Sequence, residues 1–245
     1  MGYGLKAKRV LVTGGTRGIG RATVLAFAEA GAHVVTCHRA EGPEVSRLAG
    51  DLAEHGDEHR IIRQDVTDAE GARRLLEVCR EHLGGLDVLV NNVGVDGHAL
   101  LEDLEPAQWH RVMDHNVTSA YLVSRAALPL LADGASIVNV GSAAALRGRP
   151  ASAHYGASKA AMIGFTRGLC KELGPRQIRV NAVAPGVTSD DPGSDLPPHV
   201  LERLLAATAL GRLCRPRDVA DAVLFLAGDD SRGISGATLT VDGGM

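Results

Sequence analysis

The sequence lacks long hydrophobic runs, paired cysteines and a basic surplus, and each absence excludes a class of protein. No apolar run approaches the ~18 to 20 residues of a membrane-spanning helix, and the N-terminal segment lacks the apolar stretch of a signal peptide. We therefore expect a cytoplasmic protein without a membrane partner. The four cysteines have no C-x-x-C spacing, which argues against a zinc site or a redox pair. A net charge of −3 is not the basic excess that nucleic-acid binding requires, so we expect no nucleic-acid partner.

Long linkers, internal repeats and low-complexity segments are also missing. With 45% hydrophobic and 22% charged residues, the composition is that of a globular domain. An α/β fold of 245 residues commonly forms around one core, so we predict a single domain, 1–245. The histidines, including His98, His110, His115 and His154, do not follow H-E-x-x-H or a comparable spacing. We predict no metal site, and we expect these histidines at the surface or lining a cleft.

Short β-branched segments alternate with helical patterns along the chain. The segment K-R-V-L-V-T-G-G ends in glycines and precedes apolar residues at helical spacing, which predicts a strand, a loop and a helix. Repeated along the chain, this alternation favours an α/β fold with a single-domain Rossmann-type doubly wound sheet. We expect about seven parallel strands, six helices on both faces and right-handed crossovers. The later helices are predicted near 43–55, 68–83, 107–131, 153–173 and 216–227, and the last strand near 237–241.

One irregular stretch interrupts the alternation. Residues 186–199 are rich in proline, glycine, serine and aspartate, and a short helix is expected at about 198–208. Ligands of doubly wound sheets bind beyond the carboxyl ends of the strands, and this stretch follows such an end. We therefore predict that the segment 186–208 forms a lid over the substrate.

A glycine-rich loop, residues 13–20, follows the first predicted strand and opens the first predicted helix. Its sequence T-G-G-T-R-G-I-G lets the backbone approach a pyrophosphate, whose charge is favoured by free N–H groups at the helix N-terminus. A turn packed with glycines for steric reasons is the alternative, and the strand-loop-helix context favours a dinucleotide site. The residues predicted to bind the cofactor here are Gly14, Thr16, Arg17, Gly18, Ile19 and Gly20.

The end of the second predicted strand indicates which dinucleotide binds. NAD enzymes usually carry an acidic residue there, which accepts a hydrogen bond from the 2′-hydroxyl of the adenosine ribose. This chain has His38 and Arg39 instead. The guanidinium of Arg39, together with that of Arg17, suits a 2′-phosphate, so we predict NADP(H) as the cofactor. In the alternative interpretation, Arg39 is a solvated surface charge.

Three polar residues at and after the fifth predicted strand suggest acid–base chemistry. Ser142 ends the strand, and Tyr155 and Lys159 lie one helical turn apart, so the ammonium group can lie beside the phenol. A tyrosine that acts near neutral pH needs its anion stabilised by about three pKa units, or ~4 kcal/mol. One cation at ~4 Å supplies about 4 kcal/mol at an effective dielectric constant of about 20. Each residue alone could merely cap, pack or face solvent, and their combination favours a catalytic site.

The T-G-x-x-x-G-x-G loop and the set Ser142, Tyr155 and Lys159 resemble the short-chain dehydrogenase/reductase family in its compact single-domain form. The resemblance covers the whole chain, including V-D-G-G at 241–244, and the Y-x-x-x-K spacing is narrower than that of enoyl reductases. It implies that Asn116 fixes a water that relays protons from Lys159, which completes a catalytic set of four. Tyr155 and Lys159 would also contact the cofactor, Lys159 at the nicotinamide ribose. Further cofactor contacts are implied for Asp65, Val66, Asn92, Gly94, Pro185, Gly186 and Thr188.

Within the family, the most similar patterns are those of β-ketoacyl carrier-protein reductases and polyketide ketoreductases. The resemblance implies NADPH-dependent reduction of a ketone to a secondary alcohol, with Tyr155 as general acid and Ser142 polarising the carbonyl oxygen. The substrate is expected to be a polyketide-type ketone or a β-ketoacyl thioester. Residues 130–134 lack the basic side chains usual for docking an acidic carrier protein, although Arg176 is present. A free ketone is therefore favoured over a carrier-bound thioester as the substrate. An oxidising NADP-dependent alcohol dehydrogenase and a non-catalytic NADP-binding regulatory protein stay open as alternatives.

The resemblance also implies a homotetramer, with a dimer as the alternative. Family members commonly pack through two long helices, here 107–131 and 153–173. Asp190 stands where the family usually has threonine, which leaves the nicotinamide-side contacts open. Arg147 and Arg149 follow Ser142 closely and should edge the substrate cleft, where they meet either an anionic or phenolic substrate or solvent.

Overall fold

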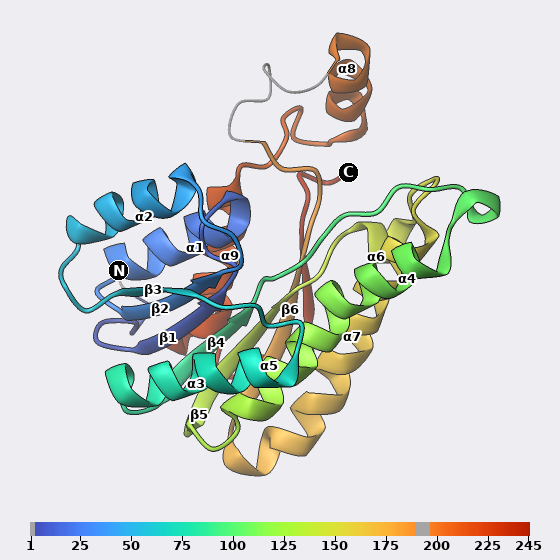
Figure 1. The fold of residues 1–245 in the computed structure, drawn as a ribbon. Helices are drawn as coiled ribbons and strands as arrows, with labels where there is room; N and C mark the ends of the chain where they lie inside the picture. The colour runs from blue at the N-terminus through green and yellow to red at the C-terminus, as the bar shows by residue number, and fades with distance from the viewer. Residues whose placement is uncertain (1–2, 190–196) are drawn as a thin grey trace.

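The computed structural model describes residues 3–189 and 197–245, and within them the chain folds around one parallel β-sheet (Figure 1). The strand order is β3-β2-β1-β4-β5-β6-β7, which confirms the predicted fold class. The order reverses between β1 and β4, where doubly wound sheets leave a crevice beyond the strand ends. The strands are β1 (Arg9–Thr13), β2 (His33–His38), β3 (Arg60–Arg63), β4 (Leu86–Asn91), β5 (Leu131–Val140), β6 (Arg179–Pro185) and β7 (Thr238–Val241).

Helices cover both faces of the sheet because both faces of its central strands are apolar. In β1, Val10 and Val12 pack into one core layer, whereas Leu11 between them packs into the other, and all three are fully buried. One layer contains α1 (Gly18–Glu29), α2 (Pro43–Ala53) and α9 (Pro216–Ala227) (Figure 1). The other contains α3 (Ala69–Leu83), α5 (Ser119–Ala127) and α7 (Ala153–Leu173).

The predicted helix near 107–131 is wrong in two respects. The structure divides it into α4 (Pro106–Met113), a π-turn (Asp114–Thr118) and then α5. In addition, Leu131 belongs to β5 and not to a helix. Pro129 lacks a backbone N–H and disfavours continuation of a helix, so the apolar residues that follow it join the sheet.

Two short helices lie near the carboxyl ends of the strands. α6 (Ala144–Arg147) follows β5, and α8 (Pro198–Ala207) buries none of its side chains. In Figure 1, α8 projects away from the sheet at the top of the view. The described part of the predicted lid includes α8, whereas Asp190 lies outside the described residues. Single 3₁₀ turns occur at Leu101–Asp103, Gly174–Arg176 and Asp229–Ser231.

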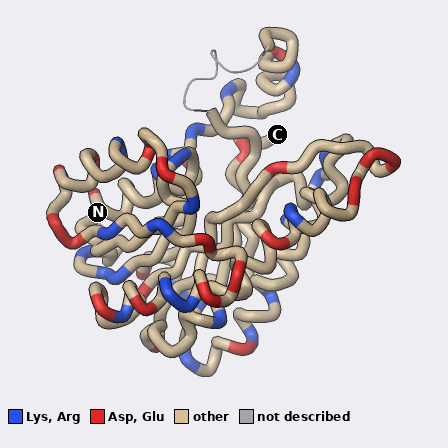
Figure 2. The backbone as a smooth tube through the Cα atoms, in the orientation of Figure 1, with Lys and Arg blue, Asp and Glu red and all other residues tan. Residues whose placement is uncertain are grey.

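Charged residues are scattered along the chain rather than gathered on one face (Figure 2). Of the helices within 3–189 and 197–245, none is both long and apolar enough to cross a membrane. In the same two ranges, no three His, Cys, Asp or Glu side chains converge as a set of metal ligands.

Candidate active site and dinucleotide cleft

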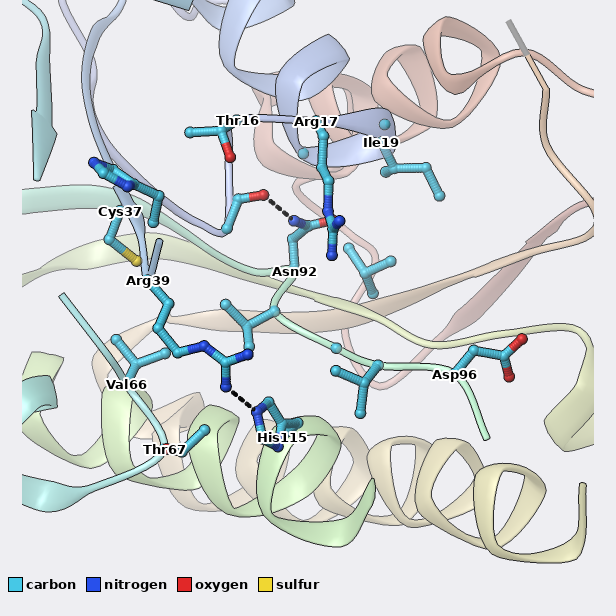
Figure 3. A pocket seen from close by; sticks show the side chains of 18 of the residues that line it. Thr16, Arg17, Ile19, Cys37, Arg39, Val66, Thr67, Asn92, Asp96 and His115 are labelled. Atoms are coloured by element: carbon cyan, nitrogen blue, oxygen red, sulfur yellow. Dashed lines mark hydrogen bonds between the residues drawn. The ribbon is translucent and has the colours of Figure 1, made fainter. Parts of the chain in front are cut away.

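A cleft of about 720 Å³ opens beyond the carboxyl ends of the central strands, where the strand order reverses. Figure 3 shows its lining from close by. The structure brings together here all the residues predicted to contact the cofactor, and with them Ser142, Tyr155 and Lys159. The other predicted cofactor residues in the lining are Gly14, Thr16, Arg17, Gly18, Ile19, Gly20, His38, Arg39, Asp65, Val66, Asn92, Gly94, Pro185, Gly186 and Thr188.

The glycine-rich loop keeps its shape through close backbone contacts. Gly14 and Gly18 have positive φ angles of 69° and 51°, a region that favours glycine. A Cβ atom on Gly20 would lie 2.2 Å from the carbonyl oxygen of Gly14, so the start of α1 packs against the loop only as glycine. The side-chain amide of Asn92 donates hydrogen bonds to the carbonyl oxygens of Thr13 (2.8 Å) and Gly14 (3.0 Å). Figure 3 shows Asn92 beside the loop. Since no side chain caps α1 and its first turn holds no acidic residue, the N–H groups there suit a phosphate.

Replacing Gly20 by alanine should destabilise the protein. The added Cβ would also lie 2.4 Å from Nδ2 of Asn92, the group that holds the loop. We expect a loss of about 1–3 kcal/mol in the free energy of unfolding, as is typical of overpacking, measured by urea denaturation. The matched control is Gly50→Ala on α2, where nothing lies within 4 Å of the added Cβ and stability should hold or rise slightly. Equal stability of the two variants would contradict the tight contact.

Arg39 lies in the cleft after β2 and contacts His115 of the π-turn (Figure 3). Nη1 of Arg39 donates a hydrogen bond to Nε2 of His115 over 2.8 Å. Because a guanidinium only donates, Nε2 accepts, and Nδ1 carries the proton that is donated to the carbonyl oxygen of Arg111 (2.8 Å). The two contacts fit one tautomer of His115, with the proton on Nδ1, and they orient the Arg39 guanidinium.

His38 and Asp65 complete this end of the cleft. Nδ1 of His38 donates to the carbonyl oxygen of Ala40 (3.0 Å). The carboxylate of Asp65 accepts hydrogen bonds from the N–H (2.9 Å) and the hydroxyl (2.8 Å) of Thr67. Burial alone would raise the pKa of Asp65, but these two bonds and the charge of Arg39 lower it overall. Asp65 is therefore an anion at neutral pH, and Arg39 offsets its charge.

Ser142, Tyr155 and Lys159 meet at the other end of the cleft. Ser142 follows β5, and the other two belong to α7. Burial raises the pKa of Tyr155, and the neighbouring Ser142 hydroxyl opposes that rise. Nζ of the buried Lys159 donates a hydrogen bond to the carbonyl oxygen of Val140 (3.0 Å) and lies 6.0 Å from the centre of the Tyr155 ring. Burial lowers the pKa of Lys159 to about 8, so its side chain is mainly a cation at neutral pH.

Asn116 is buried in the π-turn, outside the lining of the cleft. Its Nδ2 donates to the carbonyl oxygen of Val95 (3.0 Å) and to the Ser158 hydroxyl (2.8 Å), and its Oδ1 accepts from the N–H of Val95 (2.7 Å). A Cβ on Gly94 would lie 3.0 Å from Oδ1 of Asn116 and 3.1 Å from Nζ of Lys159. The two polar atoms therefore face the same small space, which the absence of a side chain at Gly94 leaves open. π-turns are frequent at functional sites, and this one places Asn116 near Lys159.

Known proteins match nearly the whole chain. A family model described as enoyl-(acyl carrier protein) reductase matches residues 14–245. A 3α-hydroxysteroid dehydrogenase of Mediterraneibacter gnavus is 37% identical over 98% of this chain and 97% of its own. A 3-oxoacyl-(acyl-carrier-protein) reductase of Pseudomonas aeruginosa is 38% identical over 98% of both chains. The solved structure of a blue fluorescent protein from a metagenomic library, in complex with NADPH, has a TM-score of 0.91 at 37% identity over 98% of both chains. The chain belongs to the short-chain dehydrogenase/reductase family.

Membership of the short-chain dehydrogenase/reductase family makes the protein an oxidoreductase of CH–OH and C=O groups, and it confirms the predicted enzyme class. The family model takes its description from enoyl reductases, whereas these two relatives are named for hydroxysteroid and 3-oxoacyl chemistry.

In this short-chain dehydrogenase/reductase, the two arginines after Ser142 pair with acidic residues. Nη1 of Arg147 lies 2.9 Å from Oδ2 of Asp242, in the C-terminal V-D-G-G segment. Arg149 pairs with Asp96 in the loop after β4, and its guanidinium carbon lies 4.9 Å from the centre of the Tyr155 ring. Each of the two arginines therefore has a protein counter-charge, which an anionic substrate would have to share or displace.

Sequence reasoning missed the roles of His115 and Asp96 in the cleft. His115 was expected only as a surface or cleft-lining histidine, although its position next to Asn116 was a usable signal. Asp96 follows Gly94 by two residues, in a loop expected to meet the cofactor. Its partner Arg149 lies 53 residues away, and no spacing rule connects the two.

Proposed function

We propose that the protein is a cytoplasmic NADPH-dependent ketoreductase, which reduces a ketone to a secondary alcohol. The observation that carries this proposal is a single cleft that joins the glycine-rich loop and Arg39 to Ser142, Tyr155 and Lys159. The structural relative solved with NADPH supports the choice of cofactor. Purified protein should oxidise NADPH in the presence of at least one member of a ketone panel. Tight NADPH binding without turnover of any ketone would instead favour a binding or regulatory protein.

The cleft suits a dinucleotide that carries a 2′-phosphate. The uncapped start of α1 offers N–H groups to a pyrophosphate, and the glycine at Gly20 lets this helix start pack against the carbonyl group of Gly14 in the loop. Arg39, with Arg17 from the loop, would supply the positive charge for the 2′-phosphate. Lys159 would hold the nicotinamide ribose. When bound, NADPH supplies the hydride that reduces the carbonyl carbon.

The residues at the other end of the cleft would handle the proton. Tyr155 would donate its phenolic proton to the carbonyl oxygen. Burial raises the pKa of Tyr155, contrary to the lowering expected from Lys159, whose Nζ lies 6.0 Å from the centre of the ring. The phenol therefore holds its proton at neutral pH, and the proposed reaction requires nearby positive charge to stabilise the phenolate that forms. The Ser142 hydroxyl would donate a hydrogen bond to the carbonyl oxygen. The cationic Lys159 stabilises the phenolate that forms, and Asn116 would position a water that returns a proton. The same residues serve the oxidation of an alcohol, because the reaction is reversible.

His115 should contribute to the choice of cofactor through Arg39. A His115→Phe variant keeps a ring but removes the acceptor that fixes the guanidinium. Since one hydrogen bond contributes about 0.5–1.5 kcal/mol, the affinity for NADP⁺ should fall by about 2- to 10-fold while that for NAD⁺ holds. Isothermal titration calorimetry with both dinucleotides measures the two affinities. An equal loss for both would assign His115 to the fold rather than to the 2′-phosphate.

We propose a free ketone, such as a polycyclic polyketide, rather than a carrier-bound thioester as the substrate. The basic residue available for an acidic carrier protein, Arg176, pairs with Asp133 (2.9 Å). Its guanidinium also donates to the carbonyl oxygen of Leu128 (3.0 Å), so a carrier would have to compete with both contacts. Steady-state assays should favour decalone- or quinone-type ketones over a β-ketoacyl thioester. A strong preference for the thioester would reverse this ranking.

We also propose a homotetramer packed through α4, α5 and α7, with a dimer as the alternative. Trp109 on α4 and Tyr121 on α5 expose 38% and 43% of their surface. Large aromatic side chains are enriched at subunit interfaces. Sedimentation velocity on the purified protein gives the oligomeric state directly.

A further inference from the structure

We propose that Arg149 and Asp96 form a charged clamp over Tyr155 that tunes how readily the phenol releases its proton. This inference deepens the proposed function, because it concerns the residue assigned there as the general acid. Arg149 and Asp96 are positioning residues here, since they act on the substrate only through Tyr155.

The side chain of Arg149 is fixed by hydrogen bonds along its length. Nε donates to the Ser152 hydroxyl (2.8 Å), and Nη1 donates to Oδ2 of Asp96 (3.1 Å). Nη2 donates to Oδ1 of Asp96 and to the carbonyl oxygen of Gly97 (3.1 Å). A guanidinium held on two edges by a carboxylate and a carbonyl has a defined plane, and this one lies 4.9 Å from the centre of the Tyr155 ring.

The clamp ties the loop after β4 to the start of α7, the helix that carries Tyr155. The buried Ser152, which immediately precedes α7, donates to the carbonyl oxygen of Gly97 (3.0 Å). The N–H of Ala99 donates to the carbonyl oxygen of Ala151 (2.8 Å). Ala151 has a φ angle of 52°, a left-handed conformation that is costly for a residue with a side chain. The surrounding contacts therefore determine the path of this segment, and they hold the Arg149 guanidinium in place over the Tyr155 ring.

The two charges of the clamp act on Tyr155 in opposite directions. Burial is the main cause of the raised pKa of Tyr155; the negative charge of Asp96 raises that pKa further, and the positive charge of Arg149 lowers it. Asp96 also opposes the fall that burial causes in the pKa of Lys159. The charged groups near the phenol are Lys159 of α7, Arg149 before α7 and Asp96 of the loop after β4. Two histidines lie next to the clamp, His98 near Asp96 and His154 near Gly97.

The directions of the pKa shifts in two variants distinguish a clamp that tunes the Tyr155 phenol from one that only holds its ring in place. Arg149→Met keeps the apolar stem and removes the charge, so the apparent pKa of the Tyr155 phenol should rise by about 0.5–1. Asp96→Asn removes the opposing charge, so this pKa should fall by about the same amount. If the clamp only held the ring in place, both substitutions would loosen the same contact and shift the pKa in the same direction. The double variant should return close to the starting value, and Arg149→Lys, which restores the cation, should lie nearer to the native protein than Arg149→Met.

The experiment is an ultraviolet titration of the phenolate in the full chain. The three tyrosines are Tyr3, Tyr121 and Tyr155, so subtraction of the curve for Tyr155→Phe isolates the phenol of interest. Shifts of opposite sign support the clamp; shifts of the same sign, or none, overturn it. Asp96 exposes 65% of its side chain, so Asp96→Asn should fold. If Arg149→Met fails to fold, the direction of the pKa shift in Asp96→Asn still tests the clamp.

The titration needs no substrate, so its outcome is independent of the ketoreductase assignment. Opposite shifts in a protein that turns over no ketone would reject the proposed function and keep the clamp. Turnover by a protein with unshifted phenol titrations would reject the clamp alone. The pH dependence of ketone reduction gives a second readout, because the limb assigned to Tyr155 should move with the titration.

Discussion

A Tyr155→Phe variant should lose ketone reduction by about 10²- to 10⁴-fold, the range that a positioned general acid contributes. The substitution removes only the hydroxyl, and the ring that packs beneath Arg149 stays. The glycine-rich loop, Arg39 and Lys159 are unchanged, so the affinity for NADPH should fall far less than the rate. Single-turnover rates of NADPH oxidation with the best ketone of the panel measure the effect.

Ser142→Ala is the companion to that variant. It removes a hydrogen-bond donor to the carbonyl oxygen but leaves the proton donor, so the two losses should differ in their dependence on pH. Tyr155→Phe should lack the limb that reports the phenol, whereas Ser142→Ala should keep it. Full turnover by Tyr155→Phe would show that the proton comes from another group.

The second large effect is expected for Arg39→Ala. Hydrogen bonds to a charged group contribute about 1.5–3 kcal/mol, so kcat/KM for NADPH should fall by about 10- to 100-fold. The value for NADH should stay the same or rise, because NADH has no 2′-phosphate for the guanidinium to bind. The ratio of the two kcat/KM values measures the preference directly.

Arg80→Ala is a suitable control for the Arg39 variant. Arg80 is an exposed arginine on α3 and does not line the cleft, so its loss changes the net charge equally and should leave the ratio unaltered. A preference for NADH in the native protein, or equal ratios in both variants, would assign Arg39 to the solvated surface.

The fold could be predicted from the sequence because its signals are local. Val10, Leu11 and Val12 form a short apolar run between polar residues, and such a run buried on both sides is typical of a parallel strand. The helix near 107–131 could not be placed as well. Apolar residues around Pro129 fit a helix or a strand equally, and the choice depends on pairing with β4, a long-range contact.

The residues of the candidate site likewise fall into those that local sequence signals indicate and those that only long-range contacts bring together. Tyr155 and Lys159 were found because helical spacing places them on one face, and the glycine-rich loop because it follows a strand. The contact between Arg39 and His115 joins residues 76 positions apart, and that between Arg149 and Asp96 joins residues 53 apart. Only the strand order brings such pairs together, so neither composition nor periodicity indicates them.

The exposed helix α8 has a consequence for how such a protein acquires new substrates. Because α8 buries none of its side chains, exchanging its residues costs the fold little. The phosphate loop and Ser142, by contrast, follow β1 and β5, and Tyr155 and Lys159 belong to α7, which packs against the sheet. Substitutions can therefore accumulate in α8 while the residues that carry the reaction stay the same. If the segment 186–208 covers the substrate, as the sequence predicts, grafting α8 between relatives should alter ketone selectivity.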